Sequence, residues 1–274
     1  MARIGRIGGL FAAFWSFLAL AFALPAAAAE DPFSNWAAIV VAGDWHAHSG
    51  GPSEAFDNAR RDVGQALEKA GFQPSNLREF SVRPERYKDA PLKSDPMAIF
   101  QTLSTLASKA TDGCLIYFTS HGAPQGVVLD QGLMPPSMLA TILDRACPNR
   151  PTVVVLSACF SGVFIPTLAK PNRMILTAAR RDRTSFGCGE ADKYPFFDDC
   201  FLQSMPKADD FPDLATDVQA CVAKREIVEG MHPPSEPQLW IGPALRPMLP
   251  LLAFSGASPP AACAATRDPT AKAC

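Results

Sequence analysis

Three apolar runs decide the fold of this chain: CLIYFT at residues 114–119, TVVVLSA at 152–158 and RMILTA at 173–178. Each run is continuous rather than alternating, which is typical of strands that are buried on both faces. A parallel sheet that helices cover on both sides provides that environment. We therefore predict an α/β fold with three layers, α/β/α, around a mostly parallel central sheet.

The neighbouring segments supply the other elements. WAAIVVAG (36–43) has the pattern of another buried strand, and SEAFDNARRDVGQALEKAGF (53–72) predicts an amphipathic helix with Ser53 as its N-cap. The helix expected over 136–147 is long enough to connect two parallel strands. Further helices are expected over 96–110 and 213–231, and short strands over 77–82 and 237–242.

The N-terminus has the pattern of a secretory signal peptide. Arg3 and Arg6 precede an apolar run over 7–24, and an alanine tract ends at Ala29. We predict cleavage of residues 1–29 and export to the periplasm or the medium, with no stable membrane insertion afterwards; an uncleaved anchor is the alternative. One domain is then expected over 33–254, followed by a flexible Ala- and Pro-rich tail over 255–274.

Composition narrows the class of partner. The formal net charge is −2 and 48% of the residues are hydrophobic, so the chain can bury a large core and shows no bulk attraction to nucleic acid. The sequence leaves the oligomeric state open.

In an oxidising compartment, most of the eight cysteines are expected to pair. If Cys159 stays a free thiol, an odd number remains, so at least one more thiol is unpaired or pairs with another chain. The short-loop candidates for disulfides are Cys188 with Cys200 and Cys263 with Cys274.

A histidine and a cysteine follow two of the predicted strands. His121-Gly122 ends LIYFTSHG, and Cys159 ends VVVLSAC. The carboxyl ends of parallel strands share one edge of a sheet, so neighbouring strands would bring imidazole and thiol together. A thiolate is a strong nucleophile, and an imidazole can move the protons of acyl transfer. Gly122 and Cys159 also offer backbone N–H groups to an oxyanion.

Two other histidines, His46 and His48, form an H-x-H pattern in a polar loop. Such a pair could ligate a metal, but no acidic residue or cysteine at a suitable spacing completes a site. We therefore predict no metal and no cofactor.

The paired segments YFTSHG and SACFSG, whose histidine and cysteine lie 38 positions apart, resemble the legumain-type peptidases, family C13 of the caspase-like cysteine proteases. WAAIVVAG and LTAARRDRTSFGC (176–188) resemble that family's first strand and its segment after the nucleophile. DNARRDVGQALEKAGF is similar to the first helix of bacterial caspase-like domains. The resemblance covers about residues 36–200 and implies a caspase-like fold.

By this resemblance, His121 is the general acid/base, Cys159 the nucleophile, and Gly122 and Cys159 the oxyanion donors, while Ser185 lines the S1 pocket. Legumains have a glutamate where this chain has Ser157, and an arginine in the loop that here reads DWHAHSGGP (44–52). Substrate binding is therefore assigned to Asp44, Ser157 and Ser185. Asp44 could pair with a basic P1 side chain or cap its own loop.

We expect an exported cysteine endopeptidase that acts on peptide or protein substrates through a thioacyl intermediate on Cys159. Transpeptidation by the same chemistry is one alternative. A non-catalytic caspase-like binding module, with Cys159 oxidised, is another, and a disulfide-stapled structural domain is a third. P1 specificity and the natural substrate remain open.

Overall fold

The structure is a computed structural model that describes residues 1–2 and 31–256. The predicted signal peptide beyond Ala2, the predicted tail beyond Gly256 and the proposed pair Cys263–Cys274 lie outside the described residues.

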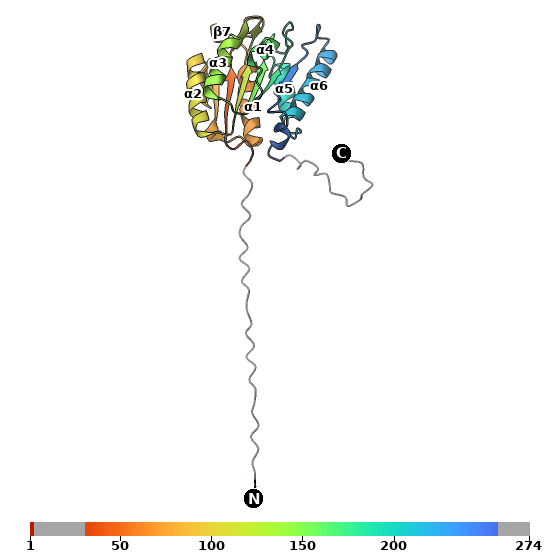
Figure 1. The fold of residues 1–274 in the computed structure, drawn as a ribbon. Helices are drawn as coiled ribbons and strands as arrows, with labels where there is room; N and C mark the ends of the chain where they lie inside the picture. The colour runs from red at the N-terminus through yellow and green to blue at the C-terminus, as the bar shows by residue number, and fades with distance from the viewer. Residues whose placement is uncertain (3–30, 257–274) are drawn as a thin grey trace. The chain divides into compact units, whose positions relative to one another are not determined.

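A seven-stranded sheet forms the middle layer, in the order β10-β9-β8-β4-β1-β2-β3 (Figure 1). Every neighbouring pair is parallel except β9 and β10, which are antiparallel. This arrangement confirms the predicted α/β class and the mostly parallel sheet. The strands are β1 (Trp36–Ala42), β2 (Leu77–Ser81), β3 (Leu92–Lys93), β4 (Gly113–Thr119), β8 (Thr152–Ser157), β9 (Arg173–Thr177) and β10 (Gln238–Ile241).

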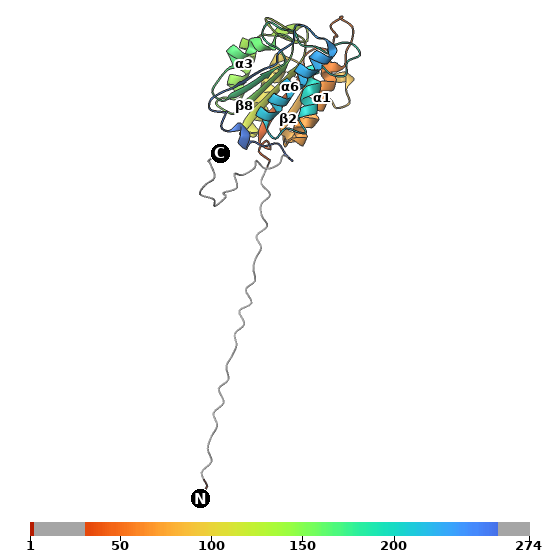
Figure 2. The same ribbon diagram turned by 90° about the vertical axis from the view of Figure 1, so that its right-hand side faces the viewer.

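Helices cover both faces because both faces of the inner strands are apolar. Along β1, Trp36, Ala38 and Val40 pack against one layer, whereas the alternate residues pack against the other. The first layer contains α1 (Ala55–Lys69), α5 (Phe196–Ser204) and α6 (Phe211–Glu229), and Figure 2 views the molecule from that side. The second layer contains α2 (Pro96–Lys109), α3 (Pro136–Ala146) and α4 (Ile165–Leu168).

Two features were not expected from the sequence. A three-stranded antiparallel sheet, β5 (Gly122–Ala123), β6 (Gly126–Leu129) and β7 (Gly132–Met134), follows β4 directly. Helix α5 precedes α6 on the same face. In addition, Ser53 is not the N-cap of α1: Glu54 takes that position, although the Ser53 hydroxyl accepts the Ala55 N–H at 3.2 Å.

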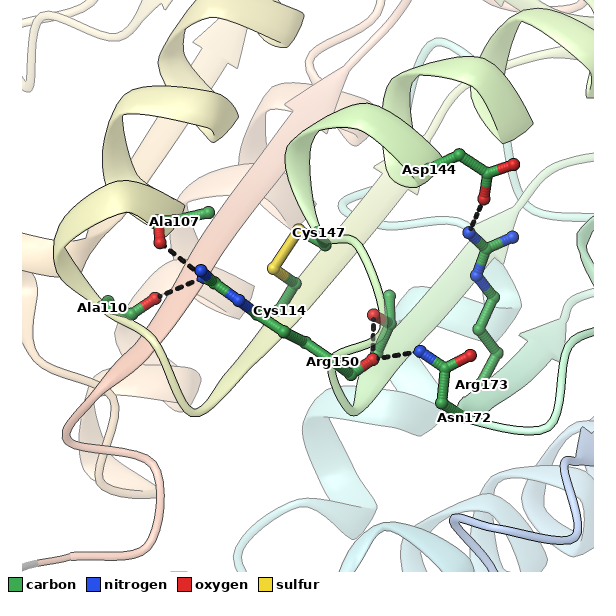
Figure 3. The surroundings of a disulfide bond; sticks show 9 residues. Ala107, Ala110, Cys114, Asp144, Cys147, Arg150, Asn172 and Arg173 are labelled. Atoms are coloured by element: carbon green, nitrogen blue, oxygen red, sulfur yellow. Dashed lines mark hydrogen bonds and ion pairs between the residues drawn. A yellow bond between two sulfur atoms is a disulfide. The ribbon is translucent and has the colours of Figure 1, made fainter.

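The described residues contain two disulfides. Cys114 at the start of β4 is bonded to Cys147 at the end of α3, beside Arg150, and Asp144 and Arg173 form an ion pair nearby (Figure 3). Cys200 of α5 is bonded to Cys221 of α6. The predicted pair Cys188–Cys200 is therefore wrong, because Cys200 faces the helix packed beside it rather than the loop after β9.

Among the described residues, no helix is both long and apolar enough to cross a membrane.

Candidate active site

Strands β4 and β8 place His121 and Cys159 at one edge of the sheet. The two strands are parallel neighbours, and their last paired residues are Thr119 and Ser157. His121 and Cys159 each lie two residues beyond this pair. The predicted neighbouring-strand arrangement is therefore present.

Gly122 brings the two strand ends into direct contact. A Cβ atom built on Gly122 would lie 2.0 Å from the carbonyl oxygen of Cys159 and 3.1 Å from the Ala158 side chain. Only a residue without a side chain allows this approach. The glycine after the histidine is thus required by the contact between the two segments.

The imidazole of His121 is held on two sides. Its Nε2 lies 3.0 Å from the carbonyl oxygen of His46, and the buried ring of Phe56 meets it edge to face at 5.0 Å. Because a carbonyl oxygen can only accept, Nε2 is the donor in this bond, and Nδ1 is left for other contacts. The ring is therefore oriented by a backbone group that the sequence pattern could not identify.

A sharp turn presents Cys159. Phe160 has a φ of 57°, an uncommon conformation for a residue with a side chain, and its N–H donates to the Arg183 carbonyl at 2.8 Å. A 3₁₀ turn over Ser161–Phe164 follows, and α4 begins directly after it. Within residues 31–256, the Cys159 N–H has no acceptor, so it is free to donate to an oxyanion.

Ser185 lies beside Cys159, and its predicted place in an S1 pocket stays a prediction. Its N–H donates to Cys159 Sγ at 3.3 Å, and its carbonyl oxygen and hydroxyl each lie 3.6 Å from that sulfur. The segment after β9 therefore forms one wall of the site.

Cys188 belongs to the same segment, and the sequence analysis considered it only as a disulfide partner. Cys159 and Cys188 are the two cysteines of the described residues that form no disulfide. Burial raises the pKa of the Cys188 thiol to about 11, with the nearby Cys159 and Asp192 adding to the shift. Cys188 therefore stays protonated at neutral pH, and a protonated thiol is a poor nucleophile.

Asp44 is engaged by its own loop. One of its carboxylate oxygens accepts the N–H groups of Trp45 and His46 at 2.6 and 3.0 Å and lies 2.7 Å from Nδ1 of His46. The arrangement is that of a loop cap, and the same loop supplies the carbonyl that orients His121. Pairing of Asp44 with a basic P1 side chain stays a prediction.

Ser157 is not brought to the same place. Its side chain is buried, and its hydroxyl donates to Asp198 of α5 at 2.8 Å. It thus offers substrate no free polar atom in this structure.

His46 and His48 do not join a cluster of metal ligands: within residues 31–256, no group of three or more His, Cys, Asp or Glu side chains could hold a metal ion.

Comparison with known proteins places this geometry in a family. The model of the peptidase C13 family, the family of the legumains, matches residues 60–236. The chain belongs to the peptidase C13 family. It is a cysteine peptidase, which confirms the resemblance of its two motifs to those of legumains.

The fold is similar to that of a solved caspase. The crystal structure of caspase-1 from Spodoptera frugiperda matches with a TM-score of 0.57 at 16% identity, over 77% of this chain and 88% of the caspase. No curated protein sequence matches the chain. The structural likeness supports the caspase-like fold.

Proposed function

We propose that this member of the C13 family is an exported endopeptidase whose nucleophile is Cys159 and whose general acid/base is His121. The observation that carries the proposal is the contact of Gly122 with the Cys159 carbonyl, which joins the histidine and cysteine segments at one sheet edge. The substrate is a peptide or protein.

The reaction follows from the groups in place. Sγ of Cys159 attacks the scissile carbonyl carbon, and the thiol proton passes to Nδ1 of His121. The N–H groups of Cys159 and Gly122 stabilise the oxyanion. His121 then protonates the leaving amine, which leaves a thioester on Cys159. Water, deprotonated by His121, hydrolyses the thioester and restores the thiol.

The experiment is cleavage of a peptide library that varies the P1 residue, with products identified by mass spectrometry. We expect products from the wild type, and a loss of rate of roughly 10³-fold or more in Cys159→Ala and His121→Ala. His232→Ala, which changes an exposed histidine, should keep the wild-type rate. Equal cleavage by wild type and Cys159→Ala would refute the proposal.

The same library bears on specificity and outcome. Preference for Arg or Lys at P1 would support Asp44 as a substrate-binding residue, and preference for Asn would show legumain-like selection without the usual glutamate. Products that carry an added amine would reveal transpeptidation instead of hydrolysis.

Export is supported by the signal-like N-terminus and by the two disulfides, since disulfides persist mainly in oxidising compartments. N-terminal sequencing of the protein recovered outside the cytoplasm should begin at Glu30. Recovery of the uncleaved chain in the cytoplasm, with reduced cysteines, would contradict export.

A further inference from the structure

A buried carboxylate lies directly beneath the proposed catalytic pair. Asp198 of α5 is fully buried and accepts three hydroxyl hydrogen bonds. Tyr117 donates to one oxygen at 2.5 Å, and Thr119 and Ser157 both donate to the other at 2.8 Å. Such an arrangement satisfies every buried hydroxyl of the cluster through one acceptor.

The three donors come from the two strands that carry the pair. Tyr117 and Thr119 lie on β4, and Ser157 lies on β8 directly opposite Thr119. Both strands end at this paired position. A displacement of either strand end relative to the other would therefore stretch the two bonds that meet on one Asp198 oxygen.

Helix α5 adds a third connection. Asp198 stands in its first turn, and the chain that enters α5 is the segment whose Ser185 contacts the Cys159 sulfur. A carboxylate is also favoured at this end of a helix, where N–H groups are unpaired. The single side chain thus joins β4, β8 and the wall of the site.

We propose that Asp198 is a positioning residue that fixes the ends of β4 and β8 so that His121 and Cys159 stay in register for catalysis. This inference rests on the proposed function. It assigns to Ser157 a role in positioning the nucleophile's strand, in contrast to the substrate binding predicted from the sequence.

The test compares kcat, KM and thermal unfolding in the full chain. Asp198→Ala removes the acceptor, and Asp198→Asn keeps one carbonyl oxygen for Thr119 and Ser157. The double variant Thr119→Val, Ser157→Ala removes the two donors that share an oxygen. Asp144→Asn is the matched control, since it breaks an ion pair with Arg173 at the opposite end of the sheet.

We expect Asp198→Ala to lower kcat about tenfold or more with KM changed less than about threefold, at a temperature where the variant is folded. Asp198→Asn should recover part of kcat. Combining the double variant with Asp198→Ala should lower kcat little further than Asp198→Ala alone, because the same hydrogen bonds are already lost. The control should lower the melting temperature and leave kcat unchanged.

A second measurement does not need turnover: the rate of Cys159 alkylation by iodoacetamide against pH, resolved from Cys188 by peptide mass spectrometry. Asp198→Ala should change this profile, and the control should not. Unchanged kcat and an unchanged profile, with a lowered melting temperature, would overturn the positioning role. If the wild type cleaves nothing and the profile still changes, the proposed function fails, whereas the positioning of the Cys159 strand end by Asp198 is still shown.

Discussion

Gly122 is a residue at which the histidine segment packs tightly against the cysteine segment. His121 and Cys159 follow strands directly, so the sequence pattern could predict them. The pattern could not predict the groups that contact their side chains, and Ser185 was expected only from the resemblance to legumains. The His46 carbonyl is a backbone atom, and Ser185 reaches the sulfur through a contact 26 residues away in the chain. Ser157 was assigned by alignment of motifs, which carries no information about which face of β8 the side chain occupies.

The close approach makes Gly122→Ala a test of the site geometry. The added methyl would lie 2.0 Å from the Cys159 carbonyl, so one segment must shift, and a shift of about 1 Å costs roughly 100-fold in rate. Gly132→Ala is the control, since its Cβ would meet nothing closer than 3.8 Å. Steady-state kcat/KM should fall in the first variant alone; an equal effect in both would show that the approach is unimportant.

At the scale of elements, continuous apolar runs identified β1, β4, β8 and β9, because strands buried on two faces are mostly apolar and show no polar alternation. The direction of β10 could not be predicted, since an apolar run does not encode direction. The strands β5 to β7 have two to four residues each, too few for a pattern. The sequence of helix α5, FFDDCFLQS, contains two adjacent aspartates. A helix with a buried face was therefore not expected there.

The disulfide between β4 and α3 should stabilise the fold without contributing to catalysis. It joins the start of β4, whereas His121 follows the strand's other end. Closing a loop over a separation of 33 residues is worth about 4 kcal/mol in the chain-entropy model. In Cys114→Ala, Cys147→Ala, denaturant titration should show that loss, with kcat nearly unchanged below the new melting temperature. A loss of kcat in the fully folded variant would show that the disulfide contributes to catalysis.

For the whole molecule, two acids with raised pKa values, buried Asp198 and half-buried Glu79, make stability depend on pH. Burial raises the pKa of Asp198 to about 7 against the hydrogen bonds from its hydroxyl donors, and burial raises that of Glu79, the partner of Arg60, to about 7 as well. Both acids have pKa values near 4 when unfolded. The folded state therefore binds protons at these two acids more tightly than the unfolded state does. The stability that the two protonated acids contribute is complete below about pH 4 and is lost as pH rises through 7.

Replacing Asp198 by asparagine should remove its part of this dependence. Three pKa units correspond to about 4 kcal/mol, so between pH 4 and pH 7 the free energy of unfolding of the wild type should fall by roughly that much relative to Asp198→Asn. Urea titrations at several pH values measure the difference. If the free energy of unfolding depended on pH in the same way in both proteins, the pKa of Asp198 would not be raised in the folded state.

The proposed chemistry requires Cys159 to be a free nucleophile that His121 activates. The direct measurement is labelling by a peptide acyloxymethyl ketone, with the modified residue located by mass spectrometry. The wild type and Cys188→Ser should label on Cys159 at similar rates, His121→Ala should label far more slowly, and Cys159→Ala should not label. Labelling of the wild type no faster than of Cys159→Ala, with the thiol shown to be reduced, would contradict the account.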